Sequence, residues 1–167
     1  LARLRSDALT QVREAIDLTD AVDAVLCGLG SRLSVHQLHV ELAADLPLVR
    51  SDAPMLHHIL LNLLDNAVKF SKPGSAILIV GRKIPGGASL AIIDEGRGLA
   101  VSQAALPKRD TAEPAPGSGL GLTVVAGFAK ALEIRFEAAN RTDAKRGAVM
   151  SLTFPLALCI QPAGETP

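Results

Sequence analysis

Two pairs of strand-like segments constrain the fold of this chain more than any other feature. Residues 76–83 and 89–94 are rich in apolar and β-branched residues and are joined through Pro85-Gly86-Gly87. Residues 134–139 and 148–154 form a second pair across a polar connection. Such pairs predict β-hairpins. Because the hairpins flank a helical segment, they favour an α+β sandwich over a parallel βαβ series.

Three segments are predicted to be helices from the spacing of their apolar residues: 21–33, 54–70 and 120–132. Asp52 is expected to cap the helix over 54–70, with Pro54 in its first turn. Residues 36–42 alternate between polar and apolar side chains, which predicts a further strand.

The two ends of the chain are expected to lie outside the main domain. Apolar residues recur at spacings of three and four within residues 1–17, which predicts the end of a preceding helix or a linker. Residues 159–167 are interpreted as a flexible tail. The domain itself is then expected over residues 18–158. Because the chain begins with Leu1 and not with Met, we expect a piece of a longer protein.

Composition excludes several classes of function. The 167 residues contain 17 basic and 17 acidic side chains, a balance that argues against a nucleic-acid-binding surface. Aromatic residues make up only 2%, which disfavours sites that stack bases or sugars on rings. Two cysteines, Cys27 and Cys159, are too few for a zinc site or a disulfide framework, which fits a reducing cytoplasm. No apolar run reaches 18 residues, so we expect no membrane contact.

The first segment with chemical potential lies in the helix over 54–70. Asn62, Asn66 and Lys69 follow one another at i, i+4 and i+7, so two amides and an ammonium group share one helix face. An amide oxygen can bind Mg²⁺, and a lysine can meet phosphate as a point charge. An ordinary amphipathic helix with a solvated polar face explains the same pattern.

Two glycine-containing segments follow. Residues 94–98 place Asp94 at the end of a predicted strand, next to Gly96 and Gly98. A carboxylate there could accept a hydrogen bond from an exocyclic amine, although a solvated turn is an alternative. Residues 117–122 open the last helix with Gly117, Gly119 and Gly121. Exposed N–H groups at such a helix start suit a phosphate, although a flexible loop before a helix is again an alternative.

Taken in order, these three segments resemble the N, G1 and G2 boxes of the GHKL superfamily of ATP-binding domains. Within it they are similar to the catalytic domain of bacterial sensor histidine kinases, over about residues 36–156. Residues 45–49, 62–67 and 73–75 also resemble the Kdp-type sensor kinases. The resemblance implies the Bergerat fold, in which a mixed, mostly antiparallel sheet carries helices on one face and an ATP lid.

The resemblance also implies roles for individual residues. Asn66 would bind Mg²⁺, Asn62 would lie beside the phosphates of ATP, and Lys69 would contact a phosphate. These three residues are therefore the expected catalytic residues. Asp94 would read the amino group of adenine. The remaining expected nucleotide contacts line the adenine pocket or the lid: Phe70, Gly96, Gly98, Leu99, Gly117, Gly119, Leu120 and Gly121.

Some family features are missing. No aromatic residue lies between Gly98 and Gly117, where the family carries a Phe-containing F box, and Ala148 replaces the usual threonine after Gly147. None of His36, His39, His57 or His58 lies in the sequence context of a phosphoacceptor histidine. The phosphoryl acceptor is therefore expected on a separate dimerisation domain of the full protein, with a response regulator downstream. A membrane-bound sensor with this chain in its cytoplasmic part would fit.

Alternative functions remain open at this point. ATPases of the Hsp90, MutL or gyrase kind place a glutamate one helical turn before the metal-binding asparagine. Asn62 occupies that position here, and an amide cannot take the proton. A nucleotide-sensing module without phosphotransfer would fit the missing F box. A serine kinase of the anti-sigma-factor type is a further alternative.

Overall fold

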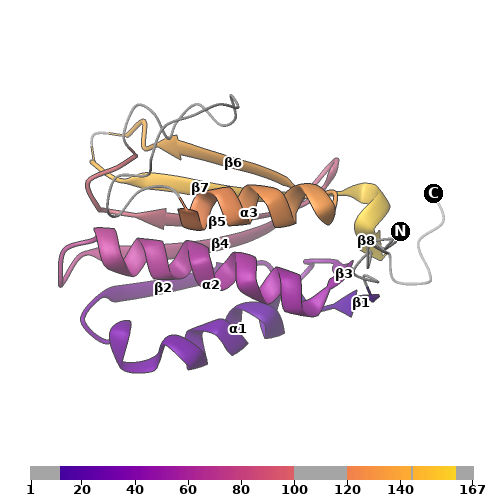
Figure 1. Cartoon of the computed structure of the whole chain (residues 1–167), viewed down its shortest axis with the longest axis horizontal. Coiled ribbons are helices and arrows are strands. Elements are labelled where there is room, and N and C mark those ends of the chain that lie inside the picture. The colour runs from indigo at the N-terminus through magenta and orange to yellow at the C-terminus, as the bar shows by residue number, and fades with distance from the viewer. Residues whose placement is uncertain (1–11, 100–119, 144, 161–167) are drawn as a thin grey trace, which may run out of the picture.

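A computed structural model describes residues 12–99, 120–143 and 145–160 of this chain. Its main body is a five-stranded sheet that carries three α-helices on one face (Figure 1). The strand order is β2-β4-β5-β7-β6; β2 runs parallel to β4, and the other neighbours are antiparallel. The strands are Gln37–Leu42 (β2), Ala76–Ile84 (β4), Gly87–Asp94 (β5), Arg135–Asn140 (β6) and Ala148–Pro155 (β7). The expected α+β sandwich with a mixed, mostly antiparallel sheet is confirmed.

Both predicted hairpins are present. β4 and β5 pair antiparallel from Ile77–Asp94 to Ile84–Gly87, and β6 pairs with β7 from Arg135–Thr153 to Asn140–Ala148. Side chains alternate between the two faces of a strand, and every second residue of β4, β5 and β7 is buried over most of its length. The sheet therefore presents a continuous apolar face to the helices.

Local sequence signals determine where the first two helices begin. Asp17 caps α1 (Leu18–Leu29), and its carboxylate accepts the N–H of Thr19 at 2.7 Å. Asp52 caps α2 (Ala53–Phe70) as predicted, with the N–H of Met55 at 3.0 Å. A short 3₁₀ turn (Gly30–Arg32) follows α1. The third helix, α3, spans Leu120–Ala131.

The apolar face of α2 anchors the helical layer. Leu56, Ile59, Leu60, Leu63 and Ala67 are each at most 2% exposed, as their helical spacing predicts. Burying one large aliphatic side chain of this kind contributes roughly 1.5–3 kcal/mol. Because α2 is held by this face, its opposite face, with Asn62 and Asn66, turns away from the sheet.

A second, three-stranded sheet corrects the predictions for the two ends. It has the order β1-β3-β8, all antiparallel, and consists of Arg13–Ile16 (β1), Leu48–Asp52 (β3) and Cys159–Ile160 (β8). The helix predicted over 1–17 is therefore wrong for Arg13–Ile16. The spacing behind it did not mark a buried face, since Val12 is 70% exposed. Its first eleven residues lie outside the described part of the chain.

The predicted tail over 159–167 is likewise wrong at its first two residues. Leu156–Leu158 form a 3₁₀ turn, and β8 then pairs with Leu48 and Val49. β3 was not predicted, because it is a short segment between a turn and the Asp52 cap. The domain bounds at 18 and 158 remain a prediction, although β1 and β8, which pair with β3, lie just outside them.

Candidate functional site

Two amide side chains meet the start of α3. Asn62 and Asn66 lie one turn apart on α2, and both are half-buried. A Cβ atom added to Gly121 would lie 3.3 Å from Oδ1 of Asn62 and 3.6 Å from Nδ2 of Asn66. Nδ2 of Asn62 donates to the carbonyl oxygen of His58 at 2.8 Å. The first turn of α3 therefore lies against both amides.

Lys69 has a different neighbour in this structure. Its Nζ lies 2.7 Å from Oδ2 of Asp65, four residues earlier on α2, and Arg32 pairs with the same carboxylate. Partial burial opposes ionisation of Asp65, but the hydrogen bonds and charges of Lys69 and Arg32 together lower its pKa. Lys69 itself is well exposed, so its ammonium group can exchange between Asp65 and another anion.

Asp94 ends β5 with a buried side chain, only 5% exposed. Its Oδ1 accepts the N–H of Gly96 at 2.8 Å and the N–H of Ala148 at 3.3 Å. No donor from the described residues reaches Oδ2. One carboxylate oxygen is thus fixed by the main chain, and the other has no hydrogen-bond donor among the described residues.

Burial raises the pKa of Asp94 above its ordinary value. The two N–H bonds and the nearby charge of Arg141 act in the opposite direction, but they offset the loss of hydration only in part. A raised pKa in a buried carboxyl group is common at functional sites.

Gly96 connects Asp94 to the end of α2. A Cβ atom at this position would lie 2.5 Å from the carbonyl oxygen of Phe70 and 2.9 Å from Oδ1 of Asp94. The half-buried ring of Phe70 in turn carries the guanidinium group of Arg97, whose carbon lies 4.5 Å from the ring centroid. Gly96 is therefore required by contacts within the protein, in addition to any approach of a ligand.

Gly98 and Leu99 meet the last residue of β6. Gly98 has a φ of +79°, which favours glycine, and a Cβ atom there would lie 2.7 Å from Oδ1 of Asn140. The same oxygen accepts the N–H of Leu99 at 2.6 Å, and Nδ2 of Asn140 donates to the carbonyl of Leu99 at 3.3 Å. Both main-chain polar groups of Leu99 are thus paired.

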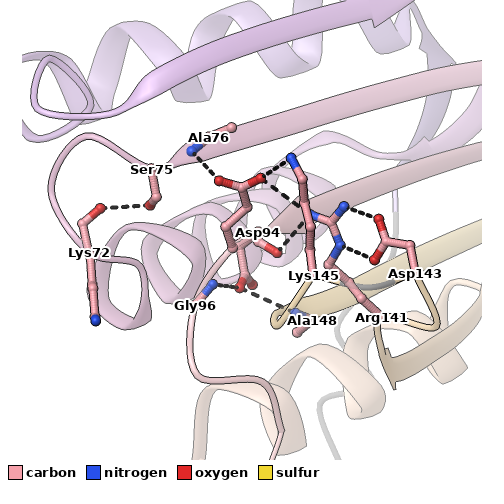
Figure 2. A network of polar contacts seen from close by, with 10 residues as sticks. Lys72, Ser75, Ala76, Asp94, Gly96, Arg141, Asp143, Lys145 and Ala148 are labelled. Carbon is pink, nitrogen blue, oxygen red and sulfur yellow. Dashed lines mark hydrogen bonds and ion pairs between the residues drawn. The ribbon is translucent and has the colours of Figure 1, made fainter.

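Charged side chains brace the same strand end (Figure 2). The carboxylate of Glu95 accepts hydrogen bonds from Nζ of Lys145 at 2.7 Å and from the N–H of Ala76 at 3.2 Å. These contacts lower the pKa of Glu95. Arg141 lies between Asp143 and Glu95, and its Nη1 reaches the carbonyl oxygen of Asp94 at 3.5 Å. Asn140 and Arg141 were not selected from the sequence, and no spacing there signals these contacts.

The structure thus brings two groups of predicted residues together. Asn62 and Asn66 meet Gly121, and Phe70 meets Gly96 beside Asp94. Gly117 and Gly119 lie outside the described residues, as do the expected lid and the position of the missing F box. Leu120 opens α3, but its side chain is not described.

These residues fit a nucleotide with Mg²⁺. Gly121 leaves room where a Cβ atom would crowd the two amides, and amide oxygens suit a hard cation. Within the described residues, no group of three or more His, Cys, Asp or Glu side chains could hold a metal ion. Mg²⁺ commonly keeps water molecules and binds few protein groups together with phosphates. A single asparagine ligand is consistent with this mode of coordination.

A separate cavity of about 680 Å³ lies between β1, α1 and the first turns of α2. Glu14, Asp20, His57 and His58 are among its lining residues, and it contains none of the predicted site residues. None of the helices in the described part of the chain is long and apolar enough to cross a membrane.

The sequence model of one protein family, described as histidine kinase-, DNA gyrase B-, and HSP90-like ATPase, matches residues 51–158. The histidine-protein kinase/phosphatase MprB of Mycobacterium avium is 33% identical over 127 residues, which are 72% of this chain and 24% of that protein. The sensor protein KdpD of Clostridium acetobutylicum is 28% identical over 156 residues, 87% of this chain and 17% of that protein. The chain thus spans about a quarter or less of these relatives.

Solved structures agree with the sequence relatives. A structure described as mycobacterial sensor histidine kinase MprB matches with a TM-score of 0.74 and 29% identity, covering 86% of this chain and 97% of that chain. Full-length ShkA, solved in complex with AMPPNP, shares the fold with a TM-score of 0.69 and 24% identity over 87% of this chain and 31% of that chain.

Proposed function

Because this chain belongs to the family of histidine kinase-, DNA gyrase B- and HSP90-like ATPases and is the ATPase domain of a sensor histidine kinase, we propose that it binds Mg·ATP. It would donate the γ-phosphoryl group to a histidine on a separate dimerisation domain. Its relatives include a signal transduction histidine-protein kinase/phosphatase and a sensor protein. A response regulator would then receive the phosphoryl group. The chain would work in the cytoplasmic part of a membrane-bound sensor.

One observation carries this proposal: Asn62 and Asn66 meet the first turn of α3, where main-chain N–H groups favour an anion. Asn66 would hold Mg²⁺ through its amide oxygen, and Asn62 would lie beside the phosphates. Bound Mg²⁺ would neutralise phosphate charge during transfer. The exposed Lys69 would move from Asp65 to a phosphate oxygen.

The other end of the site would bind the base. Oδ2 of Asp94 would accept a hydrogen bond from the amino group of adenine. Gly96 and Gly98 would keep the strand end in place beside Phe70. Leu99, Gly117, Gly119, Leu120 and Gly121 complete the proposed nucleotide contacts. Guanine carries a carbonyl oxygen where adenine has its amino group, so a buried carboxylate would lose its partner there.

Phosphotransfer is favoured over hydrolysis because the position of a hydrolytic base is taken by Asn62. Its Nδ2 donates a hydrogen bond to the carbonyl oxygen of His58. An amide cannot act as the base that takes a proton from the attacking water. A histidine imidazole is itself a nucleophile, so transfer to it requires chiefly positioning and charge neutralisation.

Calorimetric titration with ATP, with and without Mg²⁺, tests the proposal. We expect Asn66→Ala to weaken Mg·ATP at least about tenfold, or 1.4 kcal/mol, and to change metal-free ATP little. Gln37→Ala removes an exposed amide on β2 and serves as a matched control that should bind normally. Equal affinity of wild type and Asn66→Ala for Mg·ATP would contradict the metal assignment, and no binding by the wild type would contradict the proposal as a whole.

A further inference from the structure

The connection between β6 and β7 grips the end of β5 through Arg141. This side chain is only 15% exposed, and its Nη1 lies 3.5 Å from the carbonyl oxygen of Asp94 and 3.9 Å from Oε1 of Glu95 (Figure 2). Arg141 therefore contacts the main chain of the proposed adenine-reading residue without touching the side chain that would read the base.

The guanidinium group is itself held in place. Nε of Arg141 donates to Oδ1 of Asp143 at 2.8 Å, and Nη2 donates to the other oxygen of the same carboxylate. This two-pronged pairing orients the planar group. Glu95 closes the other side and is held by Lys145 and by the N–H of Ala76. The network joins the start of β4, the end of β5 and the β6–β7 connection.

The neighbouring residue, Asn140, makes a second contact with the segment after β5. Asn140 pairs with both the N–H and the carbonyl of Leu99, at 2.6 Å and 3.3 Å. The two adjacent residues Asn140 and Arg141 thus hold residues 94–99 at both ends.

The same connection also orients the carboxylate. Its returning strand brings the N–H of Ala148 to Oδ1 of Asp94, and a Cβ atom on Gly147 would lie 1.9 Å from the carbonyl oxygen of Asp94. The N–H of Arg141 pairs with the carbonyl of Gly147 at 3.0 Å and closes the turn. A shift of the connection would therefore rotate or withdraw Oδ2 from a bound base.

We propose that Asn140 and Arg141 are positioning residues that set the preference of this domain for adenine. This inference rests on the proposed function, because it assumes that Asp94 reads the base. It goes beyond that function, since neither residue would touch the nucleotide: each acts through the main chain of residues 94–99. A purely structural brace would change all ligands alike, whereas a positioning role should change base recognition selectively.

The test compares three ligands in the presence of Mg²⁺: ATP, GTP and inorganic tripolyphosphate. For Arg141→Gln and Asn140→Ala we expect the ratio of ATP to GTP affinity to fall about tenfold, the effect of losing one well-aligned hydrogen bond. Tripolyphosphate lacks a base, so its affinity should stay within about twofold of wild type. Arg82→Gln, which breaks an exposed ion pair with Glu41 elsewhere, is the matched control and should leave all three affinities unchanged.

Asp143→Asn provides a milder variant in case the others fold poorly. Asp143 is exposed, and its amide analogue keeps the shape while weakening the hold on Arg141, so a smaller drop in the same ratio is expected. An unchanged ratio in all three variants overturns the inference, as does an equal loss of affinity for all three ligands. Failure of the wild type to bind ATP would instead overturn the proposed function, and the inference with it.

Discussion

At the scale of single residues, Asp94 shows opposing demands of stability and recognition. Its burial raises its pKa, so keeping the charge costs folding free energy. Two main-chain N–H groups and the nearby Arg141 offset part of this cost. The residual cost is understandable if the carboxylate is needed as an acceptor.

Replacing Asp94 by asparagine should remove the preference for adenine over guanine. Because the N–H groups of Gly96 and Ala148 both point at Oδ1, the amide oxygen should take that place and the NH₂ group should replace Oδ2. A donor would then face the amino group of adenine. We expect at least a tenfold loss of ATP affinity, about 1.4 kcal/mol, with GTP affected less. Calorimetry checks this, with the exposed Asp23→Asn as control; retained ATP preference would refute the role of Asp94.

The same substitution should have a stability effect that depends on pH. The folded-state pKa of Asp94 is raised, so between its ordinary value and that raised value the native state holds more protons than the unfolded state. The unfolding free energy of the wild type therefore decreases as pH rises through this window. Asp94→Asn has no such loss, and its stability relative to wild type should increase from pH 4 to pH 7.

Urea unfolding without nucleotide measures this difference. Asp65, Glu95 and Asp143 have lowered pKa values and lose stabilising charge as pH falls, but both proteins share them. Their contributions cancel in the comparison. A stability difference that stays constant with pH would show that burial of Asp94 carries no charge cost.

At the scale of elements, the contact between α2 and α3 depends on a glycine. Gly121→Ala would add a Cβ atom 3.3 Å from Oδ1 of Asn62, a tight contact that the amide can relieve only by moving from its bond with His58. We expect Mg·ATP affinity to fall roughly three- to tenfold, about 0.6–1.4 kcal/mol. Gly127→Ala on the same helix has open space around its Cβ atom. It should raise stability by up to about 1 kcal/mol through helix propensity without changing affinity; equal affinities for both variants would contradict the prediction.

Helix α2 shows which elements a sequence predicts well. Its cap at Asp52 and its apolar face both follow from residues within the helix or next to it, so no distant partner is needed to recognise it. Strands β1 and β8 are different, because they contain four and two residues and form by pairing with β3. Such short strands have too little pattern of their own to be predicted.

The candidate site divides in the same way. The shared face of Asn62 and Asn66 follows from helical spacing, and the pairing of Asp65 with Lys69 could also have been expected from their i, i+4 spacing. The hydrogen bonding between Asn140 and Leu99 joins residues 41 positions apart and depends on the register of β6 against β7. Only the folded sheet brings these two residues together.

At the scale of the whole molecule, the arrangement favours a domain that holds ATP for another domain. The nearest carboxylate along α2, Asp65, is paired with Lys69 and Arg32, and its lowered pKa makes it a weak base. Asn62 cannot take a proton. Helix α2 therefore offers no carboxylate suited to activating water.

We therefore expect ATP to be hydrolysed slowly by this chain alone, since a general base contributes about 10²–10⁴-fold to such reactions. Radiolabelled ATP should leave no stable label on the chain itself. Adding the cognate dimerisation domain should transfer label to that domain in an acid-labile, base-stable form, as phosphohistidine requires, and a domain with its histidine replaced by glutamine should remain unlabelled. Rapid phosphate release by the chain alone would identify an ATPase. Tight ATP binding without transfer to the cognate domain would identify a nucleotide-sensing module, because the site would then position ATP for no acceptor.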